Sequence, residues 1–149
     1  TISAWDEAEV FRRLASQFEA SLKPEVLVVD GTGSAKKGEP TVGVARKLGA
    51  LGRTDDRQVA TSLHLASDHS SACTGFQLYL PEAWASDIKR RKAVGVPDEV
   101  VFARKWELAL GLLDQALEAG LPPRLVLADA GYGDSTEFRA DLVSRKCRY

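Results

Sequence analysis

The sequence has little of several residue types on which large classes of protein depend. It contains two cysteines, two histidines and no methionine among 149 residues. Cys73 and Cys147 alone do not make the disulfide framework of a small secreted domain, and neither histidine has partners at the spacing of a metal site. No signal-peptide pattern and no apolar run of the ~20 residues that span a bilayer are visible. We therefore expect a cytoplasmic protein without a membrane partner.

The chain also has no large excess of positive or negative charge, since its formal net charge is −1. A nearly neutral chain has no general attraction to nucleic acid, so such a partner would have to be held by local basic clusters. Two clusters are available, at Lys36 and Lys37 and in the run of residues 89–92. Each is more often a solvated surface than a ligand site, although either could contact DNA phosphates.

Length and composition predict one domain. A chain of 149 residues with 44% apolar side chains can bury a core of its own. We expect a leading helix within residues 1–23 and a mixed α/β core over residues 24–149. The chain begins at Thr1 without a methionine and stops at Tyr149 near the start of another apolar segment, so we expect it to be a piece of a longer protein.

Hydrophobic periodicity predicts the order helix, strand, three further β segments, helix, strand, helix. Apolar residues recur at helical spacing in three segments, whereas shorter segments alternate or are wholly apolar. The central strand segments resemble an antiparallel meander. Helices are expected at residues 6–22, 98–119 and 134–144, and strands at 26–30, 41–45, 58–65, 76–80 and 125–129.

Two wholly apolar runs, residues 26–29 and 125–128, each lead directly into an aspartate, Asp30 and Asp129. Such runs are typical of central strands that are buried on both faces. A carboxylate at the end of a buried strand is costly unless it is paired or holds a cation. Each aspartate alone could be a turn former, but together they predict a site for Mg²⁺, which prefers carboxylate oxygens.

A phosphate-binding loop is the main alternative for residues 31–38, which carry glycines and lysines after a strand. The pattern G-x-x-x-x-G-K-[ST] is not met, because Gly38 is followed by Glu39 and Pro40. Pro40 also disfavours an immediate helix whose N-terminus could hold a phosphate. We expect these residues to form a flexible basic turn.

Ordered motifs along nearly the whole chain resemble those of a group of bacterial insertion-sequence transposases with a DDE nuclease domain. The group usually has Asp-Asp-Thr-Gly or Asp-Glu-Thr-Gly, then Lys-Lys-Gly, then Gly-Val-Ala-Arg. The corresponding motifs here are Asp-Gly-Thr-Gly at 30–33, Lys-Lys-Gly at 36–38, Val-Gly-Val-Ala-Arg at 42–46, Leu-Tyr-Leu-Pro-Glu-Ala-Trp at 78–84, Phe-Ala-Arg-Lys at 102–105 and Ala-Asp-Ala-Gly-Tyr-Gly-Asp at 128–134.

The resemblance implies a ribonuclease H-like fold, with three antiparallel strands plus parallel strands flanked by helices and cut off before the last strand and helix. It implies two-metal phosphoryl transfer on DNA, with Mg²⁺ or Mn²⁺ held by carboxylates. Asp30 and Asp129 match the first two acidic residues, and the third, a glutamate, would lie beyond Tyr149. The basic residues that could contact DNA are Lys36, Lys37, Arg46, Lys89, Arg90 and Arg91.

Gly31 stands where that group usually has a second acidic residue. We assign the metal ligand to Asp30; if the ligand were the following position, this chain would have lost it. The alternative function is a catalytically inactive remnant that acts as a DNA-binding or assembly module. The segment from Cys147 is expected to begin a further strand, and the edge that it leaves unpaired predicts a two-fold homodimer.

Overall fold

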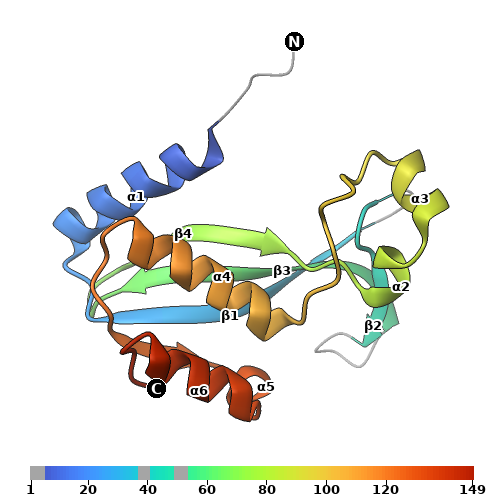
Figure 1. Ribbon diagram of the computed structural model, residues 1–149. Helices are drawn as coiled ribbons and strands as arrows, with labels where there is room; N and C mark the ends of the chain where they lie inside the picture. The colour runs from blue at the N-terminus through green and yellow to red at the C-terminus, as the bar shows by residue number, and fades with distance from the viewer. Residues whose placement is uncertain (1–5, 37–40, 49–53) are drawn as a thin grey trace.

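The computed structural model describes residues 6–36, 41–48 and 54–149 (Figure 1). One helix precedes four consecutive strands, and three helices, a fifth strand and two further helices follow. The elements are α1 (Glu7–Leu22), β1 (Val26–Ala35), β2 (Ala45–Leu48), β3 (Thr54–Ala66), β4 (Ser71–Leu78), α2 (Glu82–Ala85), α3 (Ile88–Ala93), α4 (Lys105–Glu118), β5 (Leu125–Ala128), α5 (Ala130–Gly133) and α6 (Thr136–Ser144). Within these described ranges, no helix is long and apolar enough to span a membrane.

The strands form one five-stranded mixed sheet. β3 pairs with β1 along one of its edges. Along its other edge, β3 pairs first with β2 and then with β4, and all three pairings are antiparallel. β5 pairs with β1 in parallel, from Val26 with Leu125 to Val29 with Ala128. One parallel pair beside antiparallel neighbours, flanked by helices, is the ribonuclease H-like arrangement that the resemblance implies, so the predicted fold class is confirmed.

The core lies on one face of this sheet. Leu27 and Val29 of β1 are buried there against the buried faces of α4 and α6. On the alternate face the side chain of Leu127 is 45% exposed and Val28 is only half-buried. The prediction that the two apolar strands are buried on both faces is therefore wrong for the described residues, because their helices all contribute to one core.

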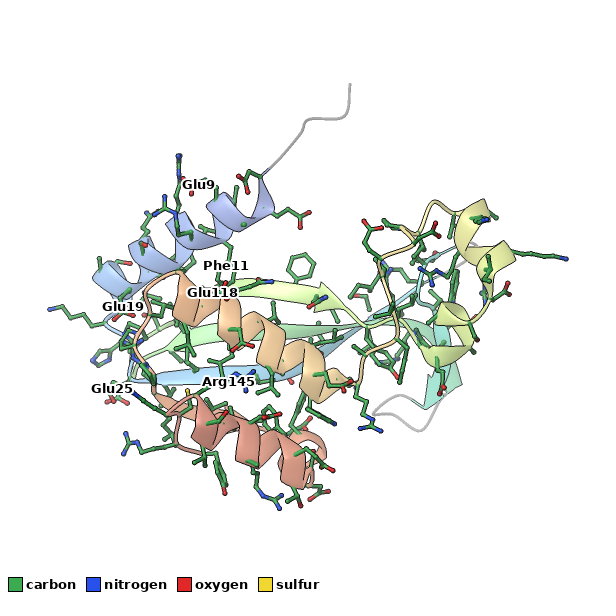
Figure 2. All side chains as sticks on the ribbon, in the orientation of Figure 1. Glu9, Phe11, Glu19, Glu25, Glu118 and Arg145 are labelled. Atoms are coloured by element: carbon green, nitrogen blue, oxygen red, sulfur yellow. The ribbon has the colours of Figure 1, made fainter. Side chains whose placement is uncertain are left out.

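Helix α1 begins where the sequence predicts. The Asp6 carboxylate caps the helix by accepting from the Glu9 amide at 3.1 Å. Phe11 then points from α1 toward β4, over Gly75 (Figure 2). A Cβ at position 75 would lie 2.5 Å from the Phe11 ring, so only glycine permits this close approach.

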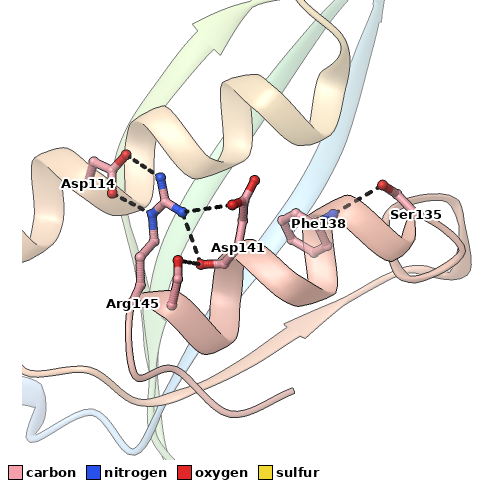
Figure 3. A network of polar contacts seen from close by, with 6 residues as sticks. Asp114, Ser135, Phe138, Asp141 and Arg145 are labelled. Carbon is pink, nitrogen blue, oxygen red and sulfur yellow. Dashed lines mark hydrogen bonds and ion pairs between the residues drawn. The ribbon is translucent and has the colours of Figure 1, made fainter.

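Helix α6 is tied to α4 by a guanidinium group. Arg145 donates from Nε and Nη2 to the two carboxylate oxygens of Asp114, at 2.6 and 2.8 Å (Figure 3). The same side chain donates from Nη1 to the Asp141 carbonyl at 2.9 Å. A two-pronged pair of this kind fixes the relative orientation of the helices as well as their distance.

Two predicted boundaries around the first strand are wrong. β1 does not end at Asp30 in a basic turn; it continues to Ala35 because β3 supplies partners, such as Ala60 for Thr32. The strand predicted at residues 41–45 is instead a turn up to residue 44, where Gly43 has φ +73°. Only residue 45 of that segment belongs to β2.

The long helix also begins later than predicted, at Lys105 instead of residue 98. The preceding segment is held open by Arg91, which donates to the carbonyls of Pro97 at 2.7 Å and of Val100 at 2.7 Å. These carbonyls are engaged by a side chain and not by a helical ladder, and α4 begins only after them.

The last residues make one isolated bridge at the place where a further strand was expected. The Val126 amide donates to the Arg148 carbonyl at 2.8 Å, and the Arg148 amide donates to the Arg124 carbonyl at 3.2 Å. This is a parallel bridge between Leu125 and Arg148. Residues next to Cys147 therefore lie beside the start of β5.

Candidate active site

Asp30 and Asp129 lie side by side on adjacent parallel strands. Val29 and Ala128 are register partners, and the two aspartates are the next residues along β1 and β5. Asp30 lies within β1, whereas Asp129 follows β5 and is the N-cap of α5. Side chains in paired strands share a face at matching register positions, so both carboxylates belong to the open face of the sheet.

The two carboxylates line one hollow of about 400 Å³, together with His64 and Leu127. His64 Nε2 lies 3.1 Å from Ser62 Oγ, and this hydroxyl donates to the Asp30 carbonyl at 3.3 Å. The histidine thus belongs to the same polar strip as Asp30, although its spacing in the sequence gave no sign of it.

Each carboxylate has one oxygen engaged by a backbone amide. Asp30 Oδ1 accepts from the Gly31 amide at 2.7 Å, and Asp129 Oδ1 accepts from the Tyr132 amide at 3.3 Å. The second oxygen of each has no protein donor in the described part of the chain. These exposed oxygen donors on two neighbouring strands fit a hard cation such as Mg²⁺, which takes one or two carboxylates and keeps several waters. Among the described residues no group of three or more acidic, histidine or cysteine side chains could hold a metal.

Tyr132 supports the site from the core side. Its hydroxyl lies 3.3 Å from Thr61 Oγ1, and both side chains are buried. Burial raises the pKa of Tyr132, the Thr61 hydrogen bond lowers it, and the negative charges of Asp129 and Asp30 raise it further. The phenol therefore stays protonated at neutral pH and can donate a hydrogen bond.

Position 31 belongs to the opposite face from Asp30. A Cβ at Gly31 would lie 3.6 Å from the Tyr132 hydroxyl and 3.7 Å from Lys105 Nζ, both ordinary contact distances. Gly31 does not line the hollow that Asp30 and Asp129 share. The geometry therefore favours Asp30 over position 31 as the partner of Asp129.

The predicted basic residues near β1 and β2 are placed only in part. Lys36 is exposed directly after β1, and its amide donates to the Asp56 carbonyl at 2.9 Å. Lys37 lies outside the described residues. Arg46 lies in β2, where its backbone pairs with Asp56, and its side chain is outside the described part of the structure.

The other predicted basic cluster lies on α3, at the β2 end of the sheet and away from α5 (Figure 1). Lys89 is exposed, and the Arg90 guanidinium lies 3.6 Å from the centre of the Trp84 ring. Arg91 is half-buried and donates to four backbone carbonyls, including that of Ala85 at 3.0 Å. Arg91 thus has a structural role, and the structure does not bring this cluster to the two aspartates.

Tyr132 and Lys105 are neighbours of the site that the sequence analysis did not name as site residues, although both lie in motifs of the family resemblance. Tyr132 follows Asp129 within the Gly-Tyr-Gly motif, and Lys105 is the first residue of α4. Nothing in their local spacing connects either of them with β1. Only the tertiary packing brings both to Gly31.

Comparison with known proteins settles the family. Residues 1–149 match the DDE superfamily endonuclease family. This chain belongs to that family. It is also 31% identical over 139 residues to a probable transposase for insertion sequence element IS701 from Microchaete diplosiphon, which covers 91% of the chain. The chain spans about a third of the length of that relative (33%). No solved structure matches it.

Membership of the DDE superfamily endonuclease family agrees with the arrangement of the sheet. The two aspartates that the sequence singled out are next to each other in this fold because β1 and β5 pair in parallel.

Proposed function

We propose that the intact protein is a DNA transposase whose catalytic domain cuts and joins DNA at transposon ends, with Asp30 and Asp129 as ligands of divalent cations. The observation that carries the proposal is that the two carboxylates directly follow the register partners Val29 and Ala128 of β1 and β5 and line one hollow. Two-metal phosphoryl transfer, which the family resemblance implies, depends on such oxygen ligands.

Bound Mg²⁺ or Mn²⁺, in a pair in the intact enzyme, would supply activation of water or a 3′ hydroxyl and stabilisation of the leaving oxygen. The chain's own residues hold and orient the carboxylates. The Gly31 amide fixes one oxygen of Asp30, and the Tyr132 amide fixes one oxygen of Asp129. The remaining oxygens face the hollow as ligands.

A third acidic ligand would come from the part of the protein beyond Tyr149, as the resemblance implies. This chain spans 33% of the length of the relative from Microchaete diplosiphon. That relative is therefore about three times as long as the matched segment. We further expect the DNA substrate to place the intact protein at the bacterial chromosome in the cytoplasm.

Thermal unfolding in the presence of Mn²⁺ tests the proposed site. At a concentration about tenfold above its dissociation constant, the ion should stabilise the wild-type chain by roughly 1.4 kcal/mol, a rise in Tm of about 3–6 °C for a domain of this size. Asp30→Asn and Asp129→Asn should each abolish the rise, whereas Asp68→Asn, in an exposed turn, should keep it. Equal rises in all four proteins would overturn the assignment of the site and favour the inactive remnant.

A further inference from the structure

The edge of β1 beyond Val29 is open on the side of β5. β5 pairs with β1 only from Val26 to Val29, whereas β1 itself continues to Ala35. Residues 30–35 are all exposed. In the described part of the chain, this edge therefore carries a row of backbone groups without a strand partner, starting at Asp30.

Lys105 lies on the core face of β1, beside the start of this open edge. Its ammonium group is 3.7 Å from the position that a Cβ of Gly31 would occupy, next to the Tyr132 hydroxyl at 3.6 Å from the same point. The side chain is half-buried and forms no ion pair or hydrogen bond within the described residues. With no side chain at position 31, the positive charge lies against bare backbone.

Two arginines surround the same end of α4 and α6. The pKa of Glu137 is lowered by backbone and Ser135 hydrogen bonds, and further by the charges of Arg104 and Arg139. Arg104 immediately precedes Lys105, at the N-cap of α4. Arg104 and Arg139 therefore lie close to the Glu137 carboxylate, and Lys105 is the cation placed beside Gly31 on the core side of β1. Asp30 and Asp129 line the hollow on the other side.

We propose that Lys105 contacts a phosphate of a DNA strand that lies along the open edge of β1, beside the Asp30–Asp129 site. The inference rests on the proposed function, because that function supplies DNA as the substrate. A lysine acts on phosphate as a point charge and needs no fixed fork geometry. A DNA backbone that lies along this edge can contact both faces of β1, the face with the two carboxylates and the face with Lys105. A β-strand from another chain would pair with the edge but would leave the ammonium without an anion.

Anisotropy of a short fluorescein-labelled DNA duplex, titrated with the 149-residue chain in Mg²⁺ at several salt concentrations, tests the contact. Lys105→Gln should weaken binding about five- to tenfold at 0.1 M salt and should reduce the salt slope by about 0.9, the value for one lost phosphate contact. Lys105→Arg should restore the affinity. Lys23→Gln, at the far end of the sheet after α1, should leave affinity and slope unchanged.

Gly31→Glu provides a second variant that keeps Lys105 in place. The space at position 31 accepts a Cβ, and the added carboxylate should pair with Lys105 Nζ and weaken DNA binding. The double variant with Gly31→Glu and Lys105→Gln should then bind DNA only slightly more weakly than Gly31→Glu alone. Such non-additivity indicates that both substitutions remove the same contact.

Lys105→Gln with wild-type affinity and salt slope would overturn the contact, as would a wild-type chain that binds no duplex. Neither result touches the proposed metal site, because the Mn²⁺-dependent rise in Tm and its loss in Asp30→Asn are measured without DNA. If Mn²⁺ did not raise the Tm of the wild type but Lys105→Gln still weakened DNA binding as expected, the cation ligands would be overturned. The DNA contact of Lys105 would then still stand.

Discussion

Thr61 Oγ1 and the Tyr132 hydroxyl lie 3.3 Å apart in the buried layer beneath the two aspartates. Thr61 is the register partner of Gly31 on β3, and Tyr132 belongs to α5. The hydrogen bond therefore joins the antiparallel part of the sheet to the turn that carries Asp129. Since both side chains are almost inaccessible to water, each hydroxyl depends on the other for satisfaction.

Tyr132→Phe should lower the free energy of unfolding by about 1 kcal/mol at neutral pH, because the Thr61 hydroxyl loses its partner. The variant should also change the alkaline limb of the stability curve. The pKa of Tyr132 is raised above its ordinary value of 10.0, chiefly by burial. A group with a raised pKa stabilises the fold fully below its unfolded pKa, so wild-type stability should fall as pH rises above about 10.

Urea unfolding at neutral pH and above pH 10 measures both effects. Tyr149→Phe is the matched control, because Tyr149 is 61% exposed and its phenol is solvated in both states. The alkaline loss of stability should be smaller in Tyr132→Phe than in Tyr149→Phe. Identical losses in the two variants would show that Tyr132 does not titrate differently in the folded state.

The 149-residue chain by itself should nick plasmid DNA little or not at all in Mn²⁺. Two carboxylates hold one ion, whereas the second ion of a two-metal site needs a further ligand. Agarose gels of supercoiled plasmid, with Asp129→Ala alongside, measure this. Strong nicking that disappears in Asp129→Ala would mean that another residue of this chain supplies the third ligand.

The Asp114–Arg145 pair should stabilise the fold more than the exposed pair of Glu9 and Arg12. Both arginines donate two bonds to their carboxylate, but Arg145 is 23% exposed and joins two helices, whereas Arg12 is 55% exposed and pairs within α1. A double-mutant cycle with Asp114→Ala and Arg145→Ala should give a coupling energy of about 1 kcal/mol. The cycle with Glu9→Ala and Arg12→Ala should give less than about 0.5 kcal/mol. Equal coupling energies would contradict a special role for the α4–α6 pair.

The chain should self-associate through the β5 edge. The bridge to Arg148 covers only the beginning of β5, at Leu125. Leu127 remains 45% exposed, and an apolar edge strand is a template for a second chain. Light scattering should detect a two-fold dimer, which Leu127→Lys should shift to monomer. Val143→Lys, at a 60% exposed position of α6, should not. A strictly monomeric wild type at high concentration would contradict the dimer.

The sequence predicted the elements whose signals are local. Helix α1 was predictable because Asp6 supplies its cap and apolar residues recur at helical spacing. The approach of Asp30 to Asp129 was predictable from two matched apolar runs, since parallel neighbours deliver their ends to one place. In both cases the information lies within a few residues of the feature.

Features that depend on distant partners could not be predicted in this way. Gly31 and Gly33 predict a turn from the sequence, but both residues belong to β1 because they pair with β3. The delayed start of α4 depends on Arg91 holding the preceding carbonyls. The contact of Lys105 with the β1 edge likewise exists only after α4 has packed on the sheet, so helical spacing gives no sign of it.

The parallel pairing of β1 with β5 also bears on how the molecule folds. β3 and β4 are joined by a short loop, whereas β1 and β5 are separated by about a hundred residues of chain, and loop-closure entropy grows with that separation. We therefore expect the antiparallel strands and α4 to assemble first and β5 to dock late. Asp129 would reach Asp30 only at that docking step. A cation held by both carboxylates would therefore bind only the completely folded chain and would stabilise it relative to partly folded states.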